Sequence, residues 1–395
     1  MEKNYLLRTL ITAFIILSVS TLLYLYTAGY RLQKEEEDPV DIRVTGMISA
    51  KSIPESASVY LDEELVTATN DSIPGIPPGK YTLKITKNGF TPWEKEIEVF
   101  PELVTDITAV LVSETPRIEP LTNTGARSPR MSPSLSALAY FSKDPEKPGV
   151  WVMPLTYNRL DFFSSAPKVV LEDTAYVNFS EGLDIQWSPK EDQLLVQQAE
   201  NSFYLVDLVS DTAKSVTNYE EIQEEWAAKI VEMRKKHLEK ALESKEFEMN
   251  ENLQESALKP ETSWAPDDKK FLYVTKGTPE NGTNGLLEYR VFNMEDPLPV
   301  GEKRDNLVFT TNPADPQPKL TWYSDNFHLI MLEKAPEENS GVVSLIRIDG
   351  TNKRELYNNV IFSDRVFSSP GGDKVVLLTS FRTEGETNLY TVSVR

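Results

Sequence analysis

The chain of 395 residues has no cysteine and only two histidines. The missing cysteines exclude disulfide bonds, thiolate nucleophiles and cysteine-ligated zinc. His237 and His328 are too few for a histidine-rich zinc site, and neither belongs to a nucleophile motif such as G-x-S-x-G. A glycine-rich phosphate loop is missing as well. The sequence therefore predicts no catalytic residue, no metal-binding residue, no cofactor-binding residue and no cofactor, and we expect a protein that is not an enzyme.

Positive charge is also scarce. The chain has 41 basic and 61 acidic residues, and its formal net charge is −20. The short basic runs at 234–236 and 269–270 are flanked by acidic residues. Nucleic-acid binding requires a cationic surface that displaces counterions, so we expect no nucleic-acid partner.

A long uncharged segment lies near the amino terminus, from Thr9 to Tyr30. About 20 helical residues cross the roughly 30 Å apolar core of a bilayer. The tyrosines at its far end suit a membrane interface. A cleavable signal peptide ending near residues 27–29 is the alternative, but its apolar part usually spans only about 7–15 residues. The segment therefore predicts an uncleaved membrane anchor.

The flanking basic residues on the two sides of this segment are nearly balanced in number. The long acidic body favours export, which leaves the short basic tail inside. We predict a cytoplasmic tail and transmembrane anchor over residues 1–34 and an acidic stalk over residues 35–45. The protein is then a single-pass protein of the cytoplasmic membrane, and its body is extracytoplasmic.

Short alternating segments follow over residues 46–115. Ala57–Asp62 and Gly79–Lys87 each place apolar residues on one face, and Pro77–Gly79 is typical of a turn. The pattern predicts a small antiparallel β-sandwich. Four acidic residues in this region lack the spacing of a calcium loop, and we expect them in turns and on the solvent face: Glu55, Asp62, Glu63 and Glu64.

This region resembles the PEGA domain, a β-sandwich module of surface and envelope proteins. Pro54-Glu55-Ser56-Ala57 stands in the place of the Pro-Glu-Gly-Ala motif, and Pro78–Tyr81, Lys87–Phe90 and Trp93 continue the resemblance. Ser56 replaces the motif glycine, and Glu63-Glu64 follows Asp62 where a glycine is usual. The resemblance implies a fold and a surface location, and it implies no chemistry.

The rest of the chain, residues 116–395, contains an internal repeat. Five segments share a pair close to Ser-Pro, a polar turn and a hydrophobic strand. The second members of these pairs are separated by 56, 77, 58 and 46 residues: Pro133, Pro189, Pro266, Ser324 and Pro370. Repeats of about 40–60 residues with several strands each predict a β-propeller. We expect five blades, with six as the alternative.

The last repeat ends after its third strand, at Arg395. Arg117–Asn123 resembles a fourth strand and belongs to no complete blade. We predict that it pairs with the carboxyl-terminal sheet and closes the ring, which removes two free edges.

The repeats resemble the Ser-Pro-Asp-Gly blades of TolB-like and WD-repeat-like periplasmic propellers. Trp187, Trp264 and Trp322 recur at one repeat position. An aromatic platform for a sugar is one interpretation, but recurrence in register favours packing between blades.

The longest spacing between repeats contains a charged segment, residues 217–260. Thr217 and Glu220 have the spacing of a capping box, and apolar residues recur at helical intervals from Ile222 to Leu238. We predict an inserted helix, or a helical hairpin that reaches Leu258. It either packs on the propeller flank or docks a partner.

The sequence thus predicts a mainly β, membrane-anchored protein with a PEGA-like sandwich and a propeller. We expect a non-catalytic binding or scaffolding role toward an envelope protein, a peptide or a glycan. One alternative is a cell-wall glycan hydrolase that uses channel carboxylates, and another is a passive surface spacer. An enzyme requires converging carboxylates with a raised pKa, a binder requires an exposed apolar or aromatic patch, and a spacer requires neither.

Overall fold

The computed structural model describes residues 2–27, 30–33, 41–155, 166–243, 247–279, 282–335, 339–381 and 386–395. The chain divides into two compact units. The first contains Met1–Leu111 and the short segment Pro299–Glu302, and the second contains Val112–Leu298 and Lys303–Arg395. Most of the predicted acidic stalk, including residues 35–38, lies outside the described residues.

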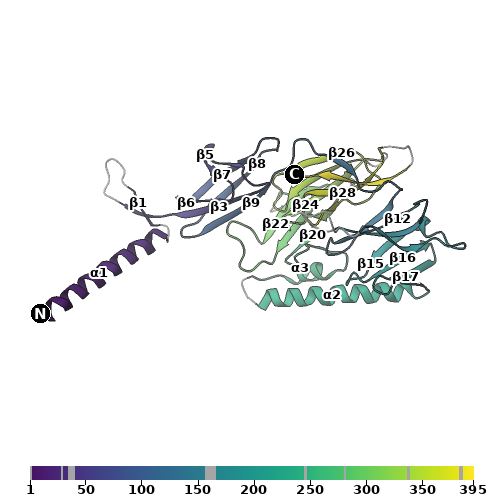
Figure 1. Ribbon diagram of the computed structural model, residues 1–395, viewed down its shortest axis with the longest axis horizontal. Coiled ribbons are helices and arrows are strands. Elements are labelled where there is room, and N and C mark those ends of the chain that lie inside the picture. The colour runs from purple at the N-terminus through teal and green to yellow at the C-terminus, as the bar shows by residue number, and fades with distance from the viewer. Residues whose placement is uncertain are drawn as a thin grey trace. The chain divides into compact units, whose positions relative to one another are not determined.

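Helix α1, Glu2–Thr27, opens the first unit (Figure 1). Its segment Arg8–Tyr26 has a mean hydropathy of 1.9 and is not buried. Among the described residues, α1 is the one helix long and apolar enough to cross a membrane. Its length and composition fit both a single-pass anchor and a signal peptide. Strands β1 (Tyr30–Gln33) and β2 (Asp41–Val44) follow it and pair with each other.

The rest of the first unit is a sandwich of two sheets. One sheet has the order β6-β3-β9, with β3 at Gly46–Ile53, β6 at Asp71–Ile76 and β9 at Val104–Val110. The other has the order β5-β4-β7-β8, with β4 at Ser58–Leu61, β5 at Glu64–Ala68, β7 at Gly79–Thr86 and β8 at Trp93–Val99.

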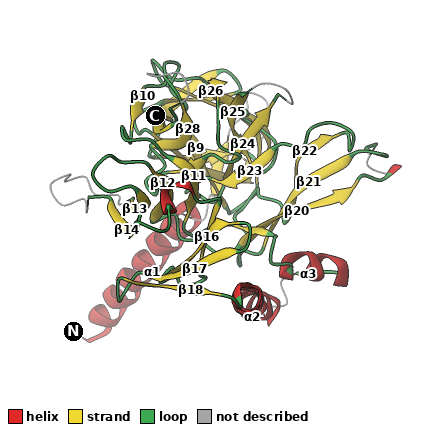
Figure 2. Cartoon of the chain, turned by 90° about the vertical axis from the view of Figure 1, so that its right-hand side faces the viewer, coloured by secondary structure: helices red, strands yellow, loops and turns green. Residues whose placement is uncertain are grey.

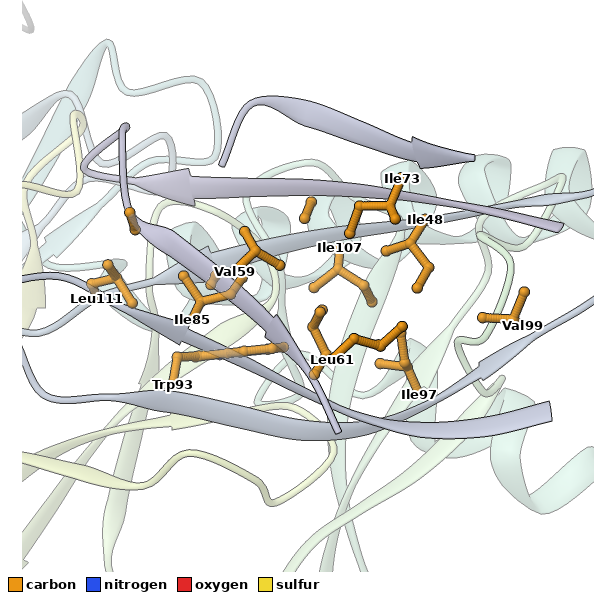
Figure 3. Packing of buried hydrophobic residues seen from close by; sticks show 14 residues of the cluster. Ile48, Val59, Leu61, Ile73, Ile85, Trp93, Ile97, Val99, Ile107 and Leu111 are labelled. Carbon is orange, nitrogen blue, oxygen red and sulfur yellow. The ribbon is translucent and has the colours of Figure 1, made fainter. Parts of the chain in front are cut away.

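Alternate residues of these strands meet in one apolar core (Figure 3). Ile48 and Ile107 of the three-stranded sheet pack with Val59, Ile85 and the nearly buried ring of Trp93 from the other sheet. This period of two in burial follows from the pleat, which sends successive side chains to opposite faces. The sandwich itself is therefore as expected.

The expectation of a wholly antiparallel sandwich is wrong for one pair of strands. β3 and β9 run parallel, with Met47 opposite Val104. Between them the chain passes through the other sheet and returns. A parallel pair requires such a crossover, because a tight hairpin joins only antiparallel strands.

The four acidic residues expected in turns and on the solvent face of the sandwich lie there. Asp62 and Glu63 form the tight connection between β4 and β5, and both have positive φ, 47° and 69°. The Asp62 carboxylate accepts a hydrogen bond from the Thr82 amide at 2.8 Å. Glu55 and Glu64 are exposed.

The described residues of the second unit form five four-stranded antiparallel sheets, numbered I to V in chain order. Sheet I consists of β11 (Arg127–Met131), β12 (Ala137–Ser142), β13 (Gly149–Pro154) and β14 (Lys168–Glu172). Sheet II consists of β15 (Asp184–Trp187), β16 (Gln193–Ala199), β17 (Ser202–Asp207) and β18 (Thr212–Val216). Sheet III consists of β19 (Ser263–Trp264), β20 (Lys270–Lys276), β21 (Leu287–Asn293) and β22 (Asp305–Thr311).

Sheet IV consists of β23 (Lys319–Trp322), β24 (His328–Lys334), β25 (Ser340–Arg347) and β26 (Arg354–Val360). Sheet V consists of β27 (Phe367–Ser368), β28 (Lys374–Thr379), β29 (Asn388–Ser393) and β10 (Ile118–Pro120). Strand β10 pairs with β29, with Glu119 opposite Thr391. The predicted pairing of Arg117–Asn123 with the carboxyl-terminal sheet is therefore confirmed.

The repeated Ser-Pro pairs form the turns between the first and second strands of the sheets. In sheet II the Ser188 hydroxyl donates to Asp192 at 2.8 Å and accepts from the Gln193 amide at 3.0 Å. Ser369 makes the equivalent bonds to Asp373 and Lys374 in sheet V, at 2.8 and 3.1 Å. Because one hydroxyl satisfies two groups of the turn, serine recurs at this position.

Helices α2 (Tyr219–Glu243) and α3 (Glu251–Leu258) lie in the chain between sheets II and III. Figures 1 and 2 both place α2 beside α3 and along sheet II. Helix α2 starts two residues after the predicted cap, Thr217. Asn218 is the residue before the helix, and its side-chain amide donates to the Glu221 carboxylate at 3.1 Å. This pair has the three-residue spacing that was predicted for Thr217 and Glu220, shifted by one residue.

Candidate binding site

Arg130 lies at a point where sheets V, I and II meet. It belongs to β11, and its Nε donates to Asp184 of β15 at 2.9 Å. Its Nη1 donates to Asp364, in the loop before β27, at 3.2 Å. A planar guanidinium with five donors is suited to holding two carboxylates at once. One side chain thus connects three sheets.

A second set of charges adjoins it. Arg127 Nη1 donates to Glu181 Oε2 at 2.8 Å, and Lys143 Nζ contacts Glu181 Oε1 at 2.6 Å. Glu181 ends the 3-10 turn η2 (Phe179–Glu181) between sheets I and II. We call the six charged residues of both sets the arginine cluster: Arg127, Arg130, Lys143, Glu181, Asp184 and Asp364.

A pocket of about 400 Å³ adjoins the arginine cluster. Arg127 and Phe141 of sheet I line it, together with Lys143 just after β12, the loop 123–126 and residues 386–387 just before β29. The Asn388 side chain fixes this loop, because it accepts hydrogen bonds from the Gly125 amide at 3.0 Å and the Thr122 hydroxyl at 3.1 Å. The pocket thus has two cationic side chains, Arg127 and Lys143, and one acidic side chain, Glu386, beside a loop that hydrogen bonds hold in place.

Close packing fixes the backbone next to Glu181. A Cβ added to Gly182 would lie 2.3 Å from Cε1 of Phe141, so the chain passes directly over that ring. The Trp187 indole donates to the Arg130 carbonyl at 2.9 Å and joins β15 to β11. Backbone and ring contacts therefore fix the charged groups on both sides.

The electrostatics favour fixed charge over proton transfer. The hydrogen bond from Lys143 is the main cause that lowers the pKa of Glu181, and the charges of Lys143 and Arg127 add to it against the effect of burial. Glu181 therefore stays ionised at neutral pH. A carboxylate with a lowered pKa is suited to binding and orienting a ligand, and poorly suited to acting as a general acid.

Of the three tryptophans expected to pack between blades, Trp187 and Trp322 lie between neighbouring sheets, whereas Trp264 packs between sheet III and the helices α2 and α3. Trp187 packs in the cluster between sheets I and II, Trp264 stacks on Phe271, and Trp322 is 5% exposed between sheets III and IV. The indole nitrogens of Trp264 and Trp322 donate to backbone carbonyls at 2.8 and 3.1 Å. These rings are not arranged as an exposed platform for a sugar.

The two histidines pair with single carboxylates. His328 is buried, with Nδ1 2.6 Å from Asp325, and His237 on α2 lies 3.6 Å from Asp268. Burial is the main cause that raises the pKa of Asp268, although the charge of His237 opposes it. Asp268 lies in the turn between β19 and β20 of sheet III, on a different sheet from the residues of the arginine cluster.

The sequence did not single out the arginine cluster. A signal for it exists in the repeat, since Arg130 stands two residues before the repeat serine Ser132, where the other repeats have Gln186, Ser263, Thr321 and Phe367. A charged residue at this one repeat position distinguishes sheet I. Within the described residues, no group of three histidine or acidic side chains could hold a metal ion.

Comparison with protein families identifies part of the first unit. Residues 45–115 match the PEGA domain. This PEGA domain contains the whole sandwich of β3 to β9. A search of curated proteins finds no match.

Among solved structures, similar chains include TolB-like β-propeller proteins. TolB of Acinetobacter baumannii is 16% identical, with a TM-score of 0.26, and the match covers 80% of this chain and 61% of that one. An oligogalacturonate lyase of Vibrio parahaemolyticus is 10% identical, with a TM-score of 0.27, over 72% of this chain and 95% of that one. The β-propeller domain of the trilobed protease of Pyrococcus furiosus is 12% identical, with a TM-score of 0.21, over 88% and 82%. Such low values assign no activity or ligand to this chain.

Proposed function

We propose that the five sheets of the second unit are the blades of a five-bladed propeller, with α2 and α3 inserted between the second and third blades. Shared apolar clusters join sheet I to sheet II and to sheet V, and another joins sheet III to sheet IV. The Thr321 hydroxyl of sheet IV donates to the carbonyl of Val366, which immediately precedes sheet V. The six-bladed alternative requires a further sheet, and the described residues of this unit form five.

The helices take the place of direct packing between sheets II and III. Trp226 of α2 packs on Leu195 and Phe203 of sheet II. Leu238, further along the same helix, packs with Phe271 and Phe292 of sheet III. With these contacts, the order of packing is sheet I, sheet II, the helices, sheet III, sheet IV and sheet V. They support the interpretation that the helices pack on the flank of the propeller, rather than extend from it to dock a partner.

We infer further that the protein is a non-catalytic binding or scaffolding protein of the cell envelope. The arginine cluster carries this proposal, because it presents ionised groups on a rigid frame beside a pocket of about 400 Å³. Propeller loops on a rigid scaffold commonly bind ligands in this way. The partner is an envelope protein, peptide or glycan that offers charged or hydrogen-bonding groups to Arg127 and Lys143.

The rival proposal of a glycan hydrolase has less support. Such an enzyme pairs two carboxyl groups, one of which has a raised pKa. In the arginine cluster the pKa of Glu181 is lowered instead. A passive spacer is also disfavoured, since a spacer has no use for a charged pocket.

The apolar segment Arg8–Tyr26 supports a place in the cytoplasmic membrane, with the body outside. The PEGA domain agrees with this location, because the family resemblance implies a surface module. An anchored chain stays with the membrane pellet after alkaline extraction, whereas a chain with a cleaved signal peptide appears in the supernatant and is shorter by mass.

Capture of partners from the envelope tests the binding role. The full chain is solubilised in a neutral detergent and incubated with envelope extract, and the retained molecules are identified by mass spectrometry. Arg127→Gln with Lys143→Gln is compared with Lys276→Gln, which removes an exposed charge from β20, away from the pocket. We expect a partner that the wild type and Lys276→Gln retain and the double variant loses. Equal retention by all three proteins rules out the arginine cluster as the binding site.

A further inference from the structure

A second pocket, of about 470 Å³, lies between helix α2 and sheet II. The helix lines it with Ile222, Glu225, Trp226 and Lys229, whose spacing places them on one face. The sheet side includes Leu205 of β17 and residues of β18 and of the turn after β15. This volume is in the range of pockets that hold small ligands.

The carboxylates of this pocket already have partners. Glu225 pairs with Lys229 of the next helical turn, with Oε1 and Nζ 2.6 Å apart. Asp192 accepts a hydrogen bond from Ser188 at 2.8 Å. Lys229 therefore compensates the charge of Glu225, and Ser188 holds the Asp192 carboxylate in its turn.

Two lysines of the same pocket have no such partners. Lys190 and Lys214 both line it and are exposed. Neither ammonium has a hydrogen-bond or ion-pair partner within the part of the chain that the structure describes. In a chain with a net charge of −20, two unpaired cations beside one pocket form a local site for an anion.

The rest of the lining is mostly polar, with one apolar patch between the helix and the sheet. Leu205, Val216 and Ile222 surround the ring of Trp226, which is only 7% exposed. A ligand that fits has an anionic end for the lysines and an apolar body for these side chains.

We propose that this pocket binds a small ligand that carries an oxyanion, a carboxylate or a phosphate, on an apolar body. Lys190 and Lys214 bind the oxyanion, and Trp226 contacts the body. The site is separate from the arginine cluster and does not depend on the role proposed for it, since the two pockets share no residue.

Matched probes test the oxyanion requirement. Titration calorimetry on the full chain in neutral detergent uses N-acetylphenylalanine, its uncharged amide and phenyl phosphate. We expect the carboxylate, the phosphate or both to bind and the amide to bind at least five-fold more weakly. The two anionic arms show which oxyanion the site prefers. Failure of both anions to bind, or equal affinity for the amide, overturns the proposal.

Charge-removing variants then locate the site. Lys190→Gln and Lys214→Gln are each expected to weaken binding by up to about five-fold, as for a solvent-exposed ion pair, and the double variant by more. Lys276→Gln, which removes the same charge elsewhere on the unit, is expected to leave the affinity unchanged. The indole N–H resonance of Trp226, assigned with Trp226→Phe, shifts on addition of the anion. Unchanged affinity in the double variant, or a Trp226 resonance that does not move, shows that the anion binds elsewhere and refutes the assignment.

Discussion

At the scale of single residues, Ser56 and Glu63 have backbone conformations that glycine adopts more easily. Their φ angles are 62° and 69°. They stand at or beside the two positions where the resemblance to the PEGA family calls for glycine. A Cβ is disfavoured in the left-handed region, whereas glycine enters it without a steric cost. The chain therefore carries local strain where the family motif avoids it.

Ser56→Gly and Glu63→Gly are expected to stabilise the PEGA domain by about 0.5–1 kcal/mol each, because the relief of strain exceeds the added entropy of the unfolded chain. Ser58→Gly in strand β4 is the matched control and is expected to destabilise by about the same amount, since φ there is not positive. Hydrogen exchange of the β4 amides measures the local free energy of opening. Slower exchange in Ser58→Gly than in Ser56→Gly contradicts this account.

The ionisation of Glu181 predicts a pH dependence. Its pKa in the folded chain is lowered from the ordinary 4.5 by Lys143 and Arg127. The resulting stabilisation is complete above pH 4.5 and is lost as pH falls through the lowered pKa. We expect the Glu181 carboxyl resonance to titrate below 4.5, and Glu181→Gln to remove this part of the acid sensitivity. Titration of Glu181 at or above 4.5 shows that the two cations do not hold it.

Residue roles were only partly predictable from the sequence. The packing of Trp322 followed from its recurrence at one repeat position, because shared positions in repeats are core positions. Arg130 was missed, since its role depends on Asp364, which is far away in the sequence. One amino-acid sequence does not show which charged residues of different sheets face one another in the fold.

At the scale of elements, helix α2 contacts two sheets with different parts of its length. Trp226 packs on sheet II and Leu238 on sheet III. The sequence predicted the helix from its apolar spacing, but Met233, which belongs to the same spacing, is 47% exposed. Helical periodicity shows which residues share a face and does not show where along the helix a partner begins and ends.

Trp226→Ala is expected to destabilise the second unit by about 3–5 kcal/mol and Leu238→Ala by about 2–5 kcal/mol, because each leaves a cavity against a sheet. Glu224→Ala, at an exposed position of the same helix, is the control and is expected to stay within about 0.5 kcal/mol of the wild type. Urea unfolding followed by circular dichroism measures all three. If Trp226→Ala unfolds like Glu224→Ala, α2 does not stabilise the sheets.

At the scale of the whole second unit, the decisive contact joins the two ends of its chain. Strand β10 adds the fourth strand to the sheet of β27, β28 and β29. The sequence predicted this pairing, because the last repeat lacked one strand and Arg117–Asn123 had no other place. The parallel pair of β3 and β9 was not predictable in the same way, since strand direction depends on the path between strands and not on their residue pattern.

The absence of native cysteine provides a clean test of this closure. Glu119 and Thr391 face each other across β10 and β29, so Glu119→Cys with Thr391→Cys places two thiols at the spacing of a cross-strand disulfide. We expect oxidation to give one cross-linked species with altered mobility on a non-reducing gel. Because the new loop encloses most of the unit, the bond should stabilise it by up to about 5 kcal/mol.

Glu119→Cys with Asp211→Cys is the matched control, since Asp211 belongs to the turn between β17 and β18 of sheet II. This pair should remain reduced within the monomer under the same conditions. If the two double variants oxidise at the same rate, β10 does not stay paired with β29. The proposed ring of five sheets would then be open, and the arginine cluster, which requires sheet I, sheet II and the loop before sheet V together, would lose Asp364.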